Sequence, residues 1–304
     1  VVLMGNNSAS ILARLKNESI KRGIPNQQMI TLFLQEEFSR RLGKSKYIDK
    51  FVLKGGFLLY SLGAGDTRAT MDSDYLMKHL SNEELSVEKV IREIIEIDNI
   101  DIINFEFKGT ERITEQNDYH GLRLKLVGAI GRSKTPIFID IAIGDVIIPE
   151  SCIISFETII TGFEKPRIRA YPMETIIAEK LDAILYLMEA SSRMKDYYDI
   201  YYLAISKNFD GKTLKEAIYS TFKNRNHLMH MKNIHGISKF KEIENLNSIW
   251  NRFIENEIRI DLELSDVIDT ILTFTLPICE AIDEDRDYNK KWNFQTKSYI
   301  DFND

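Results

Sequence analysis

The sequence predicts an α/β protein in which a mixed-sheet core is followed by a mostly helical C-terminal domain. Strand-like runs alternate with amphipathic helices up to about residue 165, and helical patterns dominate after Pro172. A chain of 304 residues is long enough for two packed units. We therefore expect an α/β domain with N-terminal helices at 1–165 and a helical domain at 166–304.

Each element is inferred from its apolar spacing and the turn residues that flank it. Two helices at 8–22 and 27–42 flank the turn Gly23-Ile24-Pro25, with Asn26 as the cap of the second. Strands are expected at 51–53, 72–77, 102–107, 122–130 and 137–143, the last two forming a hairpin. Helices are expected at 57–62, 82–97, 174–190 and 195–207, with more of them to about residue 280.

Composition and charge limit the classes of function. A hydrophobic fraction of 44% and a charged fraction of 28% are typical of a globular protein, and no apolar run reaches the ~20 residues that span a bilayer. Residues 1–5 lack the features of a signal peptide, so we expect a cytoplasmic protein without a membrane partner. The net charge of −6 is unevenly distributed: residues 191–241 carry +6 and residues 242–304 carry −9. The basic segment could attract phosphates, or it could be a solvated helical surface.

Three aspartates are the candidate metal ligands and catalytic acids. Asp72 and Asp74 are two apart on an expected strand, so their carboxylates project from the same face. Paired carboxylates favour a hard cation such as Mg²⁺, although a D-x-D sequence also occurs in surface loops. Asp140 interrupts an apolar strand, where a charge is costly unless it binds metal or pairs with a buried Arg or Lys. If the two strands are neighbours, the three acids converge on a two-metal site.

A glycine pair provides the candidate phosphate contact. Gly55 and Gly56 follow a strand, open a helix and precede the acidic pair by sixteen residues. Glycines let the backbone approach a phosphate closely, and a helix N-terminus offers free N–H groups with a partial positive charge.

These motifs together resemble a known family. Lys54-Gly55-Gly56, the run Arg68 to Asp74, and the later segments look like those of the AbiEii/AbiGii toxin nucleotidyltransferases, within the DNA polymerase β-like superfamily. The later segments are Tyr119-His120-Gly121-Leu122-Arg123, Ile139-Asp140-Ile141, Gly144-Asp145, Ala178-Glu179-Lys180-Leu181 and Arg193-Met194-Lys195-Asp196-Tyr197-Tyr198-Asp199-Ile200. The resemblance covers about residues 54–200, roughly half of the chain. It departs from many transferases at Gly56, where they have serine, and at Ser73, where relatives are often apolar.

The resemblance implies a nucleotidyltransferase core and a set of nucleotide contacts. Beside Gly55 and Gly56, these are Arg68, Lys180, Arg193, Lys195 and Asp196, with Lys180 also catalytic. Lys180 lies near the apolar stripe of its helix and could reach a triphosphate or extend to solvent. The segment 193–200 could instead clamp its helix to the preceding one.

The expected activity is transfer of a nucleotide from a nucleoside triphosphate to RNA, with Mg²⁺ or Mn²⁺ as cofactor. The resemblance implies the toxin of a toxin–antitoxin pair linked to abortive phage infection, with a cognate antitoxin as partner. It implies tRNA as acceptor, because some relatives are thought to modify the 3′ end of tRNA, and Lys223, Arg225 and Lys232 would guide it. Transfer to a protein hydroxyl, or nucleotide binding without turnover, are the alternatives.

Overall fold

The computed structural model describes residues 7–63, 67–97, 102–115 and 119–301. The chain divides into two compact units, Val1–Gly144 with Ser151–Ala170, and Asp145–Glu150 with Tyr171–Asp304. The expected boundary after residue 165 precedes strand β7 (Arg167–Ala170), which pairs with β1 (Phe51–Lys54) in the sheet of the first unit.

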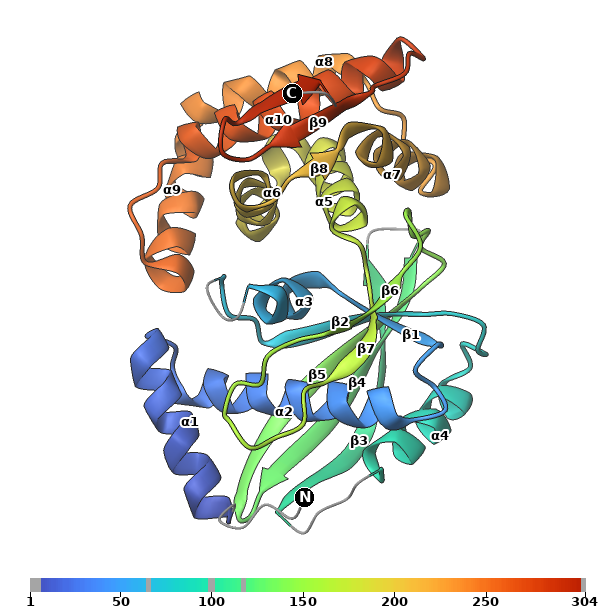
Figure 1. Cartoon of the computed structure of the whole chain (residues 1–304), viewed down its shortest axis with the longest axis vertical. Coiled ribbons are helices and arrows are strands. Elements are labelled where there is room, and N and C mark those ends of the chain that lie inside the picture. The colour runs from blue at the N-terminus through green and yellow to red at the C-terminus, as the bar shows by residue number, and fades with distance from the viewer. Residues whose placement is uncertain (1–6, 64–66, 98–101, 116–118, 302–304) are drawn as a thin grey trace. The chain divides into compact units, whose positions relative to one another are not determined.

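A seven-stranded mixed sheet forms the centre of the first unit (Figure 1). The β2–β5 and β1–β7 pairs are parallel, and the other four pairs are antiparallel, so the predicted mixed sheet is confirmed. In spatial order the strands are β3 (Ile103–Glu115), β4 (Tyr119–Ile130), β5 (Ser133–Ile143), β2 (Asp72–Met77), β1, β7 and β6 (Cys152–Ser155).

The helices of this unit are close to those expected, with one correction. They are α1 (Ser8–Arg22), α2 (Asn26–Lys44), α3 (Gly55–Leu62) and α4 (Glu84–Ile95). The prediction that Asn26 caps α2 is wrong, because Asn26 is already helical and Pro25 occupies the cap position. Strands β6 and β7, of four residues each, were not predicted.

Helix α2 covers one face of the sheet and thereby determines which face carries the aspartates. Tyr75 of β2 is buried against α2, where its hydroxyl lies 2.9 Å from Oγ of Ser39 and its ring meets Phe38 edge to face. Side chains alternate along a strand, so Asp72 and Asp74 project from the opposite face.

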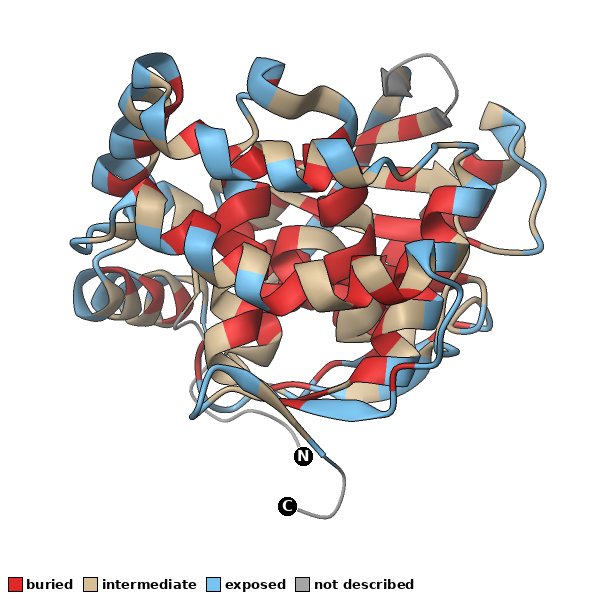
Figure 2. Ribbon diagram, turned by 90° about the horizontal axis from the view of Figure 1, so that it is seen from above, coloured by how far each residue is buried: buried red, intermediate tan, exposed pale blue. Residues whose placement is uncertain are grey.

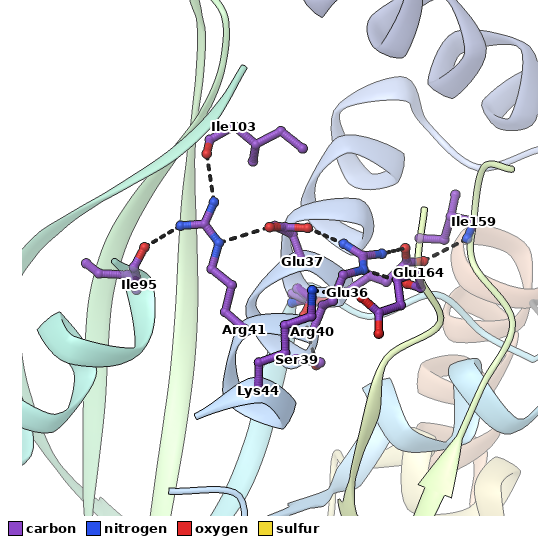
Figure 3. Close-up of polar contacts among 11 residues, drawn as sticks. Glu36, Glu37, Ser39, Arg40, Arg41, Lys44, Ile95, Ile103, Ile159 and Glu164 are labelled. Carbon is purple, nitrogen blue, oxygen red and sulfur yellow. Dashed lines mark hydrogen bonds and ion pairs between the residues drawn. The ribbon is translucent and has the colours of Figure 1, made fainter. Parts of the chain in front are cut away.

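Four charged side chains of α2 are buried between the helix and its neighbours (Figure 3). Glu36 pairs with Arg40, and Glu37 pairs with both Arg40 and Arg41. The Arg41 guanidinium also donates to the backbone carbonyls of Ile95 and Ile103, at the end of α4 and the start of β3. Because each charge has a partner, the helix keeps four ions inside the core without leaving one uncompensated.

The second unit is mostly helical, as predicted, and contains α5 (Met173–Leu187), α6 (Met194–Ser206), α7 (Gly211–Asn224), α8 (Met231–Gly236), α9 (Glu244–Phe253) and α10 (Leu264–Asp283). Buried and exposed positions form stripes along the helices (Figure 2), as amphipathic packing requires. A small antiparallel sheet of β8 (Phe209–Asp210), β9 (Lys290–Asn293) and β10 (Ser298–Asp301) was not predicted. It holds the buried Trp292, whose indole donates to the carbonyl of Ala204 at 2.7 Å.

Candidate active site

The glycine turn lies directly against the first acidic strand. Gly55 begins α3 with a φ of +68°, a conformation that side chains disfavour. A Cβ at this position would lie 2.1 Å from Oδ2 of Asp74, which is too close for any side chain. The strand–turn–helix expected from the sequence is therefore present, and its first glycine makes room for a predicted metal ligand.

Gly56 leaves space for the side chain of Arg68 in the same way. A Cβ on Gly56 would lie 3.0 Å from a terminal guanidinium nitrogen of Arg68 and 3.1 Å from Oγ1 of Thr70. Arg68 is buried, so its charge is held beside the N-terminal turn of α3. A serine here, as in many transferases, would push on Arg68, which gives a physical reason for the Gly-Gly sequence.

The register between β2 and β5 brings the third acid to the same face. Asp74 and Asp140 are direct partners across the parallel pair, and Asp72 stands opposite Phe138. Partners in register project to the same side of a sheet, with strands about 4.8 Å apart. Asp72, Asp74 and Asp140 therefore share the face that α2 leaves open.

Arg123 is the partner of Asp140. Its guanidinium donates two hydrogen bonds to the Asp140 carboxylate, of 2.8 and 2.6 Å, and lies 3.8 Å from Oδ2 of Asp72. These bonds raise the pKa of Arg123 further above its usual range. Within the described residues, no three His, Cys, Asp or Glu side chains are grouped as metal ligands. The sequence had left open a basic partner for Asp140, and the structure places one there.

Two of the three acids, Asp74 and Asp140, belong to a longer row of charges across the sheet. Lys54 on β1 is the register partner of Asp74, which is the partner of Asp140, which in turn is the partner of Arg123 on β4. We call these four residues the charge row. Neither Lys54 nor Arg123 was assigned a role from the sequence. For Arg123 a signal existed, because the polar positions 123 and 125 alternate with buried leucines at 122, 124 and 126.

The predicted nucleotide contacts Lys180, Arg193, Lys195 and Asp196 lie in the second unit. Lys180 of α5 is 11% exposed and contacts the buried carboxylates of Asp196 and Asp199 on α6 at 2.8 and 2.7 Å. Arg193 contacts the other oxygen of Asp196 at 2.7 Å, and Lys195 is exposed. Burial alone would raise the pKa of Asp196, but Lys180 and Arg193 hold it well below its usual range. These contacts clamp α6 to α5, which was the structural alternative, and the proposed contact with a triphosphate stays a prediction.

Two other family-like segments meet at Arg225. Its guanidinium lies 3.0 Å from Asp182, 3.3 Å from Asp145 and 3.6 Å from Glu179. Oδ1 of Asp182 also forms a hydrogen bond of 2.7 Å with Nδ1 of His227. Arg225 is consequently a partner of buried acids inside the second unit, and not a surface cation as the charge pattern suggested.

The fold and the acidic face with its glycine turn are those of the nucleotidyltransferase class. The chain belongs to the AbiEii family, described as nucleotidyl transferase AbiEii toxins of type IV toxin–antitoxin systems, whose family model matches residues 38–273. Membership implies an antitoxin partner. No helix in the described part of the chain is long and apolar enough to cross a membrane.

A solved structure supports the fold. JHP933 from Helicobacter pylori is 14% identical, with a TM-score of 0.50 over 86% of this chain and 95% of that one. A second H. pylori structure, provisionally described as a nucleotidyltransferase, is 15% identical with a TM-score of 0.48, over 84% of this chain and 98% of that one. A comparison with curated proteins found no significant match.

Proposed function

We propose that this protein transfers a nucleotide from a nucleoside triphosphate to RNA, with tRNA as the acceptor, in a reaction that depends on Mg²⁺ or Mn²⁺. The observation that carries the proposal is the placement of Asp74. It lies against the glycine turn at the start of α3 and beside Asp140 on the neighbouring strand. Its carboxylate is thus next to both the predicted phosphate contact and a second acid.

Carboxylate oxygens are the ligands that a hard divalent cation prefers, and the three acids can serve as a set once Asp140 is released from Arg123. Asp72 and Asp74 present carboxylate oxygens from one strand face, and Asp140 presents a third carboxylate in register with Asp74. Like charges this close repel each other unless a cation compensates them. A metal held by these residues would stabilise negative charge on the phosphates and lower the pKa of the attacking hydroxyl.

The remaining chemistry belongs to side chains and backbone of this chain. The acceptor hydroxyl oxygen bonds to the α-phosphorus, and the bond from that phosphorus to the pyrophosphate oxygen breaks. Asp140 accepts the hydroxyl proton, which requires its bonds to Arg123 to loosen. Arg68 and the first N–H groups of α3 neutralise phosphate charge at the glycine turn.

The second unit supplies the other predicted contacts. We retain Lys180, Arg193, Lys195 and Asp196 as residues that bind the triphosphate, because they match the family-like motifs. In this proposal the ion pairs of Lys180 preorganise a cation that is otherwise expensive to bury. We further propose that the reaction takes place in the cytoplasm, where tRNA and nucleoside triphosphates are found. It would contribute there to antiphage defence by abortive infection.

The test offers the protein each labelled nucleoside triphosphate together with total RNA, and then separates RNA from protein. Label on RNA that disappears with Asp74→Asn supports the proposal. Label only on protein would establish the protein-modifying alternative. Retained triphosphate binding with no label on either would indicate a binding module without turnover.

A further inference from the structure

Arg123 occupies both oxygens of a carboxylate that the proposed function requires as a metal ligand. The two hydrogen bonds to Asp140, of 2.8 and 2.6 Å, form the two-pronged arrangement that makes arginine–carboxylate pairs strong and geometrically specific. The same guanidinium lies 5.6 Å above the Phe138 ring, which borders Asp140 on β5. Arg123 is therefore held in place from two sides.

The contacts of Arg123 differ sharply among the three acids. Asp140 is engaged directly, Asp72 lies 3.8 Å from the nearer guanidinium nitrogen, and Asp74 contributes to the raised pKa of Arg123 only through its charge. Arg123 therefore obstructs Asp140 much more than it obstructs Asp72 or Asp74. A cation could bind Asp140 only if the guanidinium leaves.

We propose that Arg123 is a built-in counterion that competes with the divalent cation for Asp140. It neutralises Asp140 in the metal-free protein, and its displacement completes the metal site. Arg123 is a positioning residue in this scheme, because it acts through Asp140. The inference rests on the proposed function for the metal at Asp72 and Asp74, and it goes beyond that function by assigning a residue that sets the affinity for the metal.

Mn²⁺ binding to the whole chain tests this without any nucleotide or RNA, with free Mn²⁺ followed by electron paramagnetic resonance. Arg123→Gln should tighten Mn²⁺ binding by about tenfold, because the competing cation is gone. The matched control is Lys125→Gln. Lys125 lies on the same strand and face, two residues on, but its partner is Glu111 at 2.9 Å. The control removes the same charge from β4 and should change the affinity by less than about twofold.

A second comparison separates displacement from the general effect of removing a positive charge. In an Asp140→Asn background, Arg123→Gln should no longer tighten Mn²⁺ binding, because the contested carboxylate is absent. Equal tightening in both backgrounds, or no tightening in either, would overturn the proposal. Circular dichroism checks folding, and Arg123→Lys, which keeps the charge but loses the two-pronged bond, provides a milder variant with a smaller expected tightening.

Mn²⁺ binding distinguishes an error in the role of Arg123 from an error in the proposed metal site. If Asp74→Asn binds Mn²⁺ as tightly as the unmodified protein, the metal site itself is wrong, whatever Arg123 does. If Asp74→Asn abolishes binding and Arg123→Gln leaves it unchanged, only the role of Arg123 is wrong.

Discussion

The carboxylate of Asp74 fills the space that a side chain at position 55 would need, since a Cβ on Gly55 would lie 2.1 Å from its Oδ2. The glycine is thus required by the acid as well as by its own φ of +68°. This relationship links the two motifs that the sequence shows separately, sixteen and more residues apart.

Replacing Gly55 with alanine should therefore displace Asp74 and stop nucleotide transfer. The strained backbone alone should cost roughly 1–3 kcal/mol in free energy of unfolding. Gly144→Ala is the matched control, because Gly144 also has a positive φ, of 92°, but no described atom lies within 4 Å of its would-be Cβ. Urea unfolding and transfer assays on both variants provide the measurement. Equal activity in both would show that the Gly55–Asp74 contact is irrelevant to the reaction.

Asp74→Asn should abolish transfer while the protein stays folded. Removing one of several adjacent acids relieves repulsion, so we expect the melting temperature to hold or rise. Thermal unfolding in a chelator, followed by the labelled-nucleotide assay, checks both parts. A melting temperature several degrees lower would mean that Asp74 is chiefly structural.

Glu36 should make the stability of the protein depend on pH between about 4.5 and 7. Burial raises the pKa of this carboxyl to about 7, in spite of the opposing effect of Arg40. The folded state then holds the proton more tightly than the unfolded state does, so stability is greatest below the unfolded pKa and falls as the pH rises through 7. Free energies of unfolding at pH 5, 6, 7 and 8 should decline by this contribution, and the decline should be missing from Glu36→Gln. Parallel pH profiles for the two proteins would contradict the prediction.

Lys180→Met should destabilise the second unit by about 3–5 kcal/mol, because it leaves two buried carboxylates without their shared cation. Lys195→Met is the matched control on the same segment, and this exposed side chain should matter by less than about 0.5 kcal/mol. Denaturant unfolding measures both. Where enough Lys180→Met stays folded, triphosphate binding should also be weaker. A loss of stability with unchanged triphosphate affinity would leave Lys180 a purely structural role.

Reversing the charge of exposed lysines in the basic segment should weaken transfer to RNA and spare triphosphate binding. Lys223→Glu and Lys232→Glu should each reduce the salt dependence of RNA affinity by about 0.7 in log–log slope for every lost phosphate contact. Replacement of Lys297, an exposed lysine in the acidic C-terminal segment, by glutamate is the control. Unaltered RNA affinity in Lys223→Glu and Lys232→Glu would mean that these lysines lie on a solvated surface and do not contact RNA.

Arg225→Glu should instead unfold the second unit, because it adds a fourth acid to Asp145, Glu179 and Asp182.

Local patterns were sufficient to predict the strand that carries the acids. Asp72–Met77 is a strand at the residues expected, and the alternation at 137–143 places Asp140 opposite the buried isoleucines. Both depend on a two-residue period, which is a property of neighbouring residues. The partner of Asp140 could not be predicted in the same way. Arg123 is seventeen residues away, and which residue of β4 lies opposite Asp140 depends on register, which sequence spacing alone does not determine.

In the second unit, too, sequence spacing did not predict which residues contact each other. The helix spacing of Lys180 indicated an inward position but not the identity of its neighbours, which come from α6. Arg225 looked like one more cation in a basic run, because three of its acidic neighbours lie forty or more residues away in sequence. Charge counts along a chain do not distinguish a paired buried ion from a solvated one.

The four buried charged side chains of α2 (Figure 3) limit how the sequence of this protein can evolve. The charges compensate one another inside the core through the pairs of Glu36 with Arg40 and of Glu37 with Arg40 and Arg41. Replacing any one of the four residues alone leaves a partner buried without compensation for its lost hydration. Replacing all four together with apolar residues of similar volume would be close to neutral, apart from the backbone groups that bond to Glu36, Arg40 and Arg41. Single steps between the two solutions are unfavourable. These four positions should accordingly change as a set among relatives, and covary more strongly than their spacing on a helix would otherwise produce.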